Sequence, residues 1–174
     1  IKANLDIELV VDMMRMAQHI DIAVVVSGDG DFAPAIRAVQ QMGVRVEVVT
    51  SLAALRTFHD MHRLHGRREG YPVPPWPALE TLRALPKDAE IDLAFVDADK
   101  GGYIDYWEEL VPRMRPGGVL LIDNVFAGGR VVEEKPGDDT ARDIKAFNAH
   151  AAEDSRVDLV MLPIADGLTL ARKL

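Results

Sequence analysis

Short apolar runs that end in acidic residues are the feature that most constrains the fold of this chain. Three such runs are IAVVVS at residues 22–27, IDLAFV at 91–96 and VLLI at 119–122, and they are followed by GDGD, DADK and DN. Continuous apolar runs of this length are typical of parallel strands that are buried on both faces. Because ligands bind at the carboxyl ends of the strands in such sheets, we expect these acidic residues to converge on a site.

Helical patterns separate the apolar runs, which predicts an α/β fold. Apolar residues recur at helical spacing at 5–17, and further helices are predicted at 35–42, 52–61, 77–85, 103–114 and 140–153. A fourth apolar strand is predicted at 44–50, and residues 158–163 and 168–173 are predicted to form an antiparallel hairpin at the sheet edge. The residues RPGG at 115–118 predict a turn.

The expected architecture is a single doubly wound, mostly parallel, Rossmann-like sheet. It should contain about six strands and carry helices on both faces. The four apolar strands are expected to be parallel and central, because each is a nearly continuous hydrophobic run.

Composition excludes several functional classes. The chain has 174 residues, of which 48% are hydrophobic and 28% charged, as in a globular protein with a real core. The lack of cysteine excludes a disulfide framework and a thiolate zinc site. A net charge of −8 disfavours a nucleic-acid partner. The apolar runs are too short to span a membrane and no secretory leader is visible, so we expect a cytoplasmic protein with no membrane partner.

Four motifs occur in one order within residues 76–174. They are FVDADKGGY at 95–103, RPGGVLLIDNVFAGGRV at 115–131, DDTARDIKAFN at 138–148 and LPIADGLTLARK at 162–173. This region resembles the carboxyl-terminal half of cation-dependent O-methyltransferases of the caffeoyl-CoA and catechol type. The resemblance implies that Asp97, Asp123 and Asn124 bind a divalent metal. It also implies that Asp99 contributes to the S-adenosylmethionine pocket, and that Lys100 acts beside Asp97 in catalysis by deprotonating the substrate hydroxyl.

The chemistry of these side chains agrees with that resemblance. Two carboxylates and one amide oxygen are hard ligands that suit Mg²⁺ or Ca²⁺. A metal lowers the pKa of a phenolic oxygen bound to it, and a nearby lysine can take the proton. The expected reaction is methyl transfer from S-adenosylmethionine to a catechol-type hydroxyl, so the expected partner is a small aromatic hydroxyl compound.

Residues 1–58 carry a different set of motifs. KANLDIELVVDMM at 2–14 is followed by VVVSGDGDFAPAIRAVQQMGVRVEVV at 24–49 and by SLAALRTFHD at 51–60. This region resembles NYN domains, which are relatives of the PIN nucleases. The resemblance implies a metal-dependent ribonuclease that uses Asp12, Asp29 and Asp31, and RNA is a partner only under this alternative. Asp29 and Asp31 are equally suited to cap the helix that begins near Pro34.

The two resemblances indicate a splice of two α/β proteins. We expect one hybrid domain over 1–174, with an NYN-like segment at 1–58, a junction at 59–77 and an O-methyltransferase-like half at 78–174. A recombined or designed chimera is the leading explanation, and a natural fusion or an assembly error are the alternatives. If strand 22–27 lies beside the strand of Asp97, Gly28 and Gly30 fall where the cofactor glycines of a methyltransferase sit. The third functional hypothesis is a catalytically inert scaffold.

Overall fold

The computed structural model describes residues 5–28, 32–49, 78–133, 135 and 137–174, with side chains from residue 11 onward. The helices are α1 (Leu5–Met16), α2 (Ala33–Gln41), α4 (Ala78–Ala84), α5 (Tyr103–Leu110) and α6 (Asp139–Ala152). The strands are β1 (Ile22–Ser27), β2 (Arg45–Val49), β3 (Ile91–Asp97), β4 (Met114–Asp123), β5 (Val157–Leu162) and β6 (Leu168–Lys173). The helix predicted at 52–61 lies outside the described residues.

The six strands form one mixed sheet in the order β2-β1-β3-β4-β6-β5. β2, β1, β3 and β4 are parallel, whereas β6 is antiparallel to both β4 and β5. The predicted α/β fold class and the carboxyl-terminal hairpin are therefore confirmed. One expectation is wrong, because among the described strands β2 lies at the edge of the sheet rather than in its centre. Its charged residues Arg45 and Glu47 alternate with valines, as suits a strand that is covered only in part.

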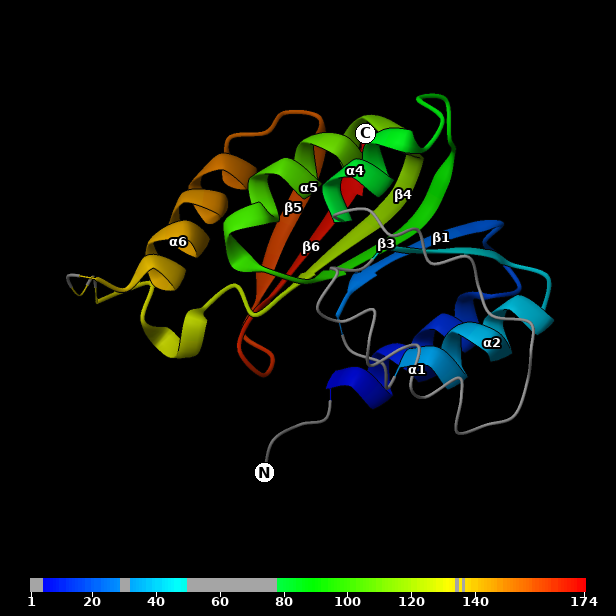
Figure 1. Ribbon diagram of the computed structural model, residues 1–174, viewed down its shortest axis with the longest axis horizontal. Coiled ribbons are helices and arrows are strands. Elements are labelled where there is room, and N and C mark those ends of the chain that lie inside the picture. The colour runs from blue at the N-terminus through cyan, green and yellow to red at the C-terminus, as the bar shows by residue number, and fades with distance from the viewer. Residues whose placement is uncertain (1–4, 29–31, 50–77, 134, 136) are drawn as a thin grey trace.

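Helices cover both faces of the sheet (Figure 1). On one face α4, α5 and α6 pack against β1, β3 and β4 around a core that contains Trp107 and Phe147. On the other face α1 and α2 pack against β1, β2 and β3 around Met13, Ile36 and Phe95. No helix in the described parts of the chain is both long and apolar enough to cross a bilayer.

The predicted turn at 115–118 is instead part of β4. The register between β3 and β4 shifts between the pair Ile91–Met114 and the pair Leu93–Val119, so β4 carries extra residues in a bulge. Gly117 has a φ of +82°, and a Cβ at Gly118 would lie 2.7 Å from the carbonyl oxygen of Ile91. The two glycines thus permit a strongly bent strand where their sequence pattern predicted a break. The helix predicted at 103–114 corresponds to α5 followed by a 3-10 helix at Val111–Arg113, and only Met114 belongs to β4 instead.

A buried carboxylate connects β3 to the start of β1. Asp92, whose side chain is 5% exposed, accepts hydrogen bonds of 2.8 Å from the backbone N–H groups of both Asp21 and Ile22. It also forms an ion pair with Arg115 of β4. Burial alone would raise the pKa of Asp92, but these donors outweigh it and hold the pKa below its usual value. One side chain therefore ties three strands together.

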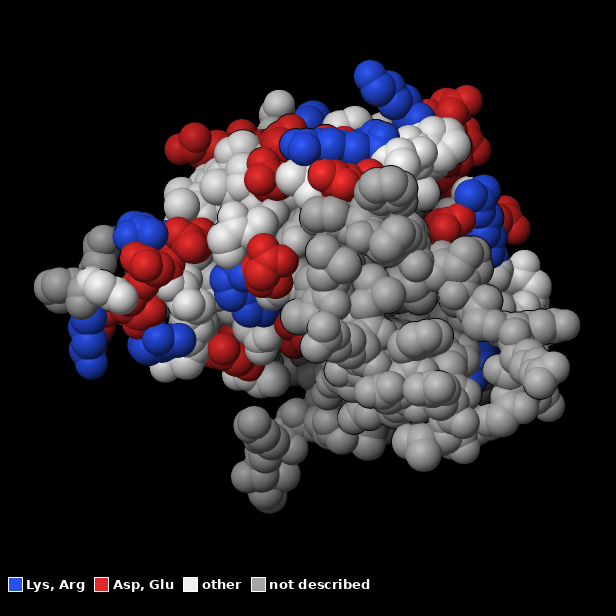
Figure 2. All heavy atoms as spheres, viewed as in Figure 1, with Lys and Arg blue, Asp and Glu red and all other residues white. Residues whose placement is uncertain are grey.

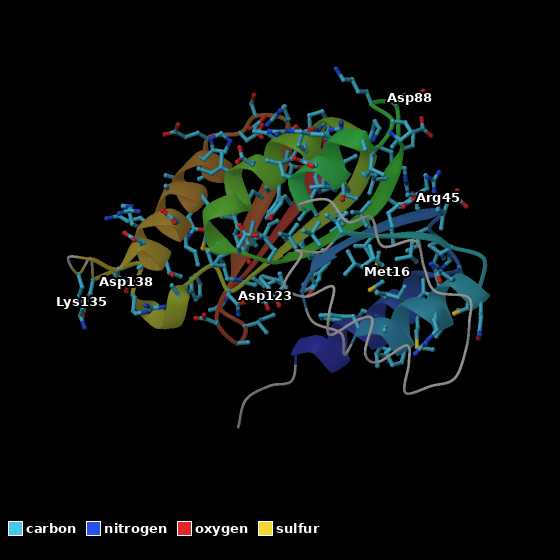
Figure 3. The ribbon with its side chains drawn as sticks, in the orientation of Figure 1. Met16, Arg45, Asp88, Asp123, Lys135 and Asp138 are labelled. Atoms are coloured by element: carbon cyan, nitrogen blue, oxygen red, sulfur yellow. The ribbon has the colours of Figure 1, made fainter. Side chains whose placement is uncertain are left out.

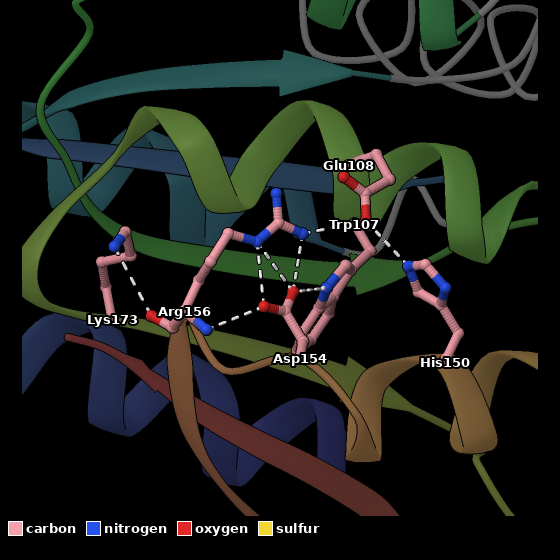
Figure 4. A network of polar contacts seen from close by, with 6 residues as sticks. All are labelled: Trp107, Glu108, His150, Asp154, Arg156 and Lys173. Atoms are coloured by element: carbon pink, nitrogen blue, oxygen red, sulfur yellow. Dashed lines mark hydrogen bonds and ion pairs between the residues drawn. The ribbon is translucent and has the colours of Figure 1, made fainter.

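A second polar network lies near the amino end of β5 (Figure 4). The Trp107 indole donates a 2.7 Å hydrogen bond to Asp154, and the Arg156 guanidinium contacts both Asp154 and Glu108. His150 of α6 lies 2.7 Å from Glu108 of α5. Hydrogen bonding from Arg156 holds the pKa of Asp154 well below its usual value. This network joins α5, α6 and β5 at the end of the sheet opposite to Asp123.

Candidate functional site

The carboxyl ends of β1, β3 and β4 meet at one edge of the sheet. Ser27, the last residue of β1, pairs with Asp97, the last residue of β3. Asp123 ends the neighbouring strand β4. Figure 3 shows Asp123 at this edge, whereas Arg45 and Asp88 lie at the opposite end of the sheet. The predicted convergence of acidic strand ends is therefore observed for Asp97 and Asp123, while Asp29 and Asp31 lie outside the described residues.

Lys100 forms hydrogen bonds with residues at the ends of both β3 and β4. Its Nζ donates hydrogen bonds to Asp97 Oδ1 at 3.1 Å and to Asn124 Oδ1 at 3.0 Å. The side chains of Lys100 and Asp97 are 19% and 29% exposed, so this contact is partly shielded from water. Two oxygen atoms, one from the end of β3 and one from the turn after β4, thus point at one positive charge.

Tyr103 is a site residue to which the sequence analysis assigned no role. Its ring is fully buried, and its hydroxyl donates a 2.9 Å hydrogen bond to the carbonyl oxygen of Asp123. The same hydroxyl accepts a 2.5 Å hydrogen bond from Lys100 Nζ, which lies 4.7 Å from the ring centroid. Burial, together with the carboxylates of Asp97, Asp123 and Asp99, raises the pKa of Tyr103. The phenol therefore stays protonated and links helix α5 to the end of β4.

The chain turns sharply after β4 and presents the amide of Asn124. Asn124 has a φ of +58°, a left-handed conformation that asparagine tolerates better than most residues. Its backbone N–H donates a 2.7 Å hydrogen bond to Asp123 Oδ1. The side chain of Asn148 in α6 donates to the carbonyl oxygen of Val125 at 2.8 Å, which fixes the chain just beyond the turn. Local strain is thus held by contacts from a distant helix.

The loop between β5 and β6 supports the same turn. The backbone N–H groups of Val125 and Phe126 donate to the carbonyl oxygens of Gly167 and Asp166. The Asp166 carboxylate accepts a 2.6 Å hydrogen bond from the N–H of Gly128. A Cβ at Gly167 would lie only 2.6 Å from the Phe126 ring. These contacts give Asp166 and Gly167 of the LPIADG motif a structural role beside the turn after β4.

Asp99 is held by a second tyrosine that the sequence analysis also missed. The Tyr106 hydroxyl donates a 2.6 Å hydrogen bond to Asp99 Oδ1. Burial raises the pKa of Tyr106, and its contact with Asp99 raises it further. Gly102 makes room for this pair, because a Cβ there would lie 2.7 Å from the Tyr106 ring and 2.8 Å from Asp99 Oδ2. The sequence signal for these two residues was their three-residue spacing in DADKGGYIDY, since this spacing places both tyrosines on the buried face of α5.

The donor set at the ends of β3 and β4 suits a hard cation. Asp97 and Asp123 supply carboxylates and Asn124 supplies an amide oxygen, and these are the ligand types that Mg²⁺ and Ca²⁺ prefer. The side-chain oxygens of Asp97 and Asn124 already converge on one cationic atom. The described residues contain no group of three or more His, Asp or Glu that could hold a metal, so a metal here would depend on the amide and on further oxygens from water or substrate.

The other predicted site residues are only partly described. Gly28 lies half-buried just after β1, and Gly30 falls outside the described residues. Asp12 lies on α1 with 63% of its side chain exposed, and its carboxylate is 3.4 Å from the Arg15 guanidinium. The alternative nuclease cluster of Asp12, Asp29 and Asp31 therefore stays a prediction.

Charges of both signs are mixed on the face seen in Figure 2. Among the described residues, blue and red side chains alternate along the edge above α4 and α5 and again at the end of α6. On this face, therefore, neither sign of charge forms a continuous patch among the described residues.

Family models match the two parts of the chain separately. Residues 71–174 match the O-methyltransferase family, and residues 1–63 match the NYN domain. Tricin synthase 2 of Oryza sativa subsp. japonica is 46% identical in an alignment of 114 residues that covers 62% of this chain and 38% of that protein. Caffeoyl-CoA O-methyltransferase 2 of Zea mays is 40% identical in an alignment of 109 residues that covers 56% of this chain and 40% of that protein. The chain thus spans less than half the length of these relatives.

A solved structure extends the similarity over nearly the whole chain. The SAH-bound Podospora anserina methyltransferase PaMTH1 matches with a TM-score of 0.76 at 25% identity. The match covers 95% of this chain and 78% of that one. The described sheet is therefore similar to that of a methyltransferase in the NYN-matching part as well as in the remainder.

Proposed function

Because this chain belongs to the O-methyltransferase family through residues 71–174, we propose that it transfers a methyl group from S-adenosylmethionine to a catechol-type hydroxyl with the aid of a divalent metal. The observation that carries the proposal is the convergence of Asp97 and Asn124 on the ammonium group of Lys100. Oxygen atoms held in this way are prepared for a cation before any ligand arrives.

Asp97, Asp123 and Asn124 are the residues that would hold Mg²⁺ or Ca²⁺. A bound metal would supply Lewis acidity, which lowers the pKa of a phenolic oxygen. The protein keeps two of these ligands in place through Tyr103, which donates to the backbone of Asp123, and through the Asp123 carboxylate, which accepts the N–H of Asn124. Lys100 lies beside the same oxygens; after its ammonium form has given up a proton to water, the neutral amine at Nζ would accept the proton that the substrate hydroxyl releases.

Asp99 and Gly28 are the described residues that we assign to the cofactor. Both lie just beyond the ends of adjacent strands, Gly28 after β1 and Asp99 after β3. The Tyr106 hydroxyl fixes the exposed Asp99 carboxylate in one orientation. A carboxylate held in this way can recognise polar groups of S-adenosylmethionine without first losing side-chain freedom.

The test is methylation of a catechol by the purified chain with S-adenosylmethionine and MgCl₂, followed by mass spectrometry. Asp123→Asn keeps the shape of the side chain but removes its charge, and we expect turnover to fall by at least about 100-fold. Asp139→Asn is the control, because Asp139 is 72% exposed and lies at the start of α6. Equal turnover in Asp123→Asn, or undiminished turnover after chelation of the metal, would contradict the proposal.

A further inference from the structure

Lys100 occupies an unusual place for a lysine side chain. Its ammonium group is bound by Asp97, Asn124 and the hydroxyl of Tyr103, at 3.1, 3.0 and 2.5 Å. Only 19% of the side chain is exposed, although lysine usually extends its charge into water. The structure has therefore used three oxygen atoms to hold one positive charge at the ends of β3 and β4.

The oxygens that hold this ammonium group are the ones that a metal would need. Asp97 and Asn124 contribute the same side chains to Lys100 that the proposed function assigns to the metal. A divalent ion binds oxygen at about 2.0–2.6 Å, so it cannot occupy the position between Asp97 Oδ1 and Asn124 Oδ1 that the ammonium group now fills. Repulsion between the two cations adds to this steric conflict.

We propose that Lys100 is a tethered cation that holds Asp97 and Asn124 together in the metal-free protein and that a divalent ion must displace it. This inference rests on the proposed function, because it takes the metal to bind at these residues. Lys100 is then a positioning residue that neutralises the Asp97 carboxylate before the metal arrives. It also sets the affinity of the site, because each binding event must first break its hydrogen bonds.

Tyr103 provides the position to which the displaced ammonium group can move. Its hydroxyl accepts a hydrogen bond from Lys100 Nζ and does not belong to the proposed metal ligands. The displaced ammonium group can therefore keep this one hydrogen bond while its two other partners are replaced by water, which makes it more accessible to solvent.

The first test is titration of the full chain with CaCl₂ by calorimetry, for the wild type and for Lys100→Met. Methionine keeps the length of the side chain but removes its charge. We expect Lys100→Met to bind Ca²⁺ at least about tenfold more tightly, and to melt at a lower temperature than the wild type when no metal is present. Lys87→Met is the control, because Lys87 lies in the exposed loop before β3 at the far end of the sheet, and it should change neither quantity.

The possible outcomes separate this inference from the proposed function. Ca²⁺ binding of equal strength in wild type and Lys100→Met would overturn only the role of Lys100. If neither protein binds Ca²⁺, both the inference and the metal site fail.

A measurement on the wild type alone keeps the inference testable if Lys100→Met does not fold. Brief acetylation followed by peptide mass spectrometry should show severalfold more modification of Lys100 when Ca²⁺ is present, with Lys87 unchanged. Unchanged or lower modification of Lys100 would overturn the displacement.

Discussion

The region around β3 and β4 differs from the region of β1 and β2 in the way its parts are fixed. Around β3 and β4, polar side chains such as Lys100, Tyr103 and Asn148 bridge separate elements in addition to the apolar packing. In the other region α1 and α2 cover the sheet mainly through apolar side chains, including Phe32 and Ile36. Apolar packing of this kind requires only side chains of suitable size in a suitable hydrophobic pattern. The polar bridges, in contrast, require particular residues at particular positions.

The comparison explains how an NYN-like segment can stand in a methyltransferase-like sheet. β1 pairs with β3 and β2 pairs with β1, which are the positions expected for this segment if it completes the sheet. Parallel βαβ units share one handedness and one backbone spacing, so one unit can replace another. The described side chains that converge around Lys100, in contrast, all come from the O-methyltransferase-matching part. The NYN-matching part therefore supplies two strands of the sheet, whereas the described polar contacts around Lys100 belong to the O-methyltransferase-matching part.

The largest effect is expected where the two regions meet, at Asp92. Asp92→Ala removes the acceptor for two backbone N–H groups of the first region and leaves Arg115 without this partner. We expect the free energy of unfolding to fall by about 4 kcal/mol, the usual cost of breaking a buried pair and leaving donors unsatisfied. Urea unfolding measures this directly. A loss below about 1 kcal/mol would show that Asp92 does not hold the regions together.

Substitution of two buried isoleucines tests whether the two regions unfold in one cooperative transition. Ile36 of α2 and Ile144 of α6 are both buried, and they belong to the cores on opposite faces of the sheet. Each change to alanine should cost about 3 kcal/mol. If 1–174 is one hybrid domain, both variants shift a single transition that circular dichroism and tryptophan fluorescence report alike. Two separate transitions, with only one of them shifted by Ile36→Ala, would show instead that the regions are independent.

A smaller effect should distinguish the polar networks of the two regions. Asp154→Asn weakens the contacts to Arg156 and Trp107, and we expect a loss of about 1–2 kcal/mol at neutral pH. The folded-state pKa of Asp154 is lowered, so its contribution is fully present above the unfolded value of about 3.9. It is lost as the pH falls through the folded value. Urea unfolding should therefore show the difference between variant and wild type shrinking below about pH 4.

The matched change in the other region is Glu47→Gln. Glu47 pairs with Arg45 at 2.7 Å on the edge strand, where the arginine side chain is 60% exposed. An ion pair of this kind contributes little, so the loss should stay below about 0.5 kcal/mol. A cost equal to that of Asp154→Asn would mean that the two regions are fixed by polar contacts of similar strength. A difference for Asp154→Asn that is independent of pH would contradict the role given to its charge.

The sequence predicted those parts of the fold that depend on local patterns. The strand at 22–27 and the hairpin strand at 168–173 have the predicted bounds, because continuous apolar runs and turn residues mark them clearly. β2 was misplaced in the sheet because an apolar run does not reveal how many neighbours a strand has. The bulge in β4 was taken for a turn, since glycine and proline indicate a bend without telling whether hydrogen bonds continue beyond it.

Part of the candidate site could also be predicted from the sequence. Acidic residues after adjacent strands indicated where Asp97 and Asp123 would meet, and the motifs suggested Asn124 and Lys100. Tyr103 and Tyr106 were missed because their apolar rings fit the buried pattern of α5, and only tertiary structure shows what their hydroxyl groups contact. Asp92 was missed for the opposite reason, since a charged residue within an apolar strand gives no hint of a partner seventy residues away.

Calorimetric titration of S-adenosylmethionine into the purified chain, with and without MgCl₂, tests most directly whether the first region rebuilds a cofactor site beside the chemistry of the second. We predict binding of about micromolar strength, with a weaker response in Asp99→Asn because the Tyr106-held carboxylate is lost. No heat of binding from a chain that melts cooperatively would contradict the account. It would mean that β1 and β2 of the NYN-matching part complete the sheet without completing the cofactor site.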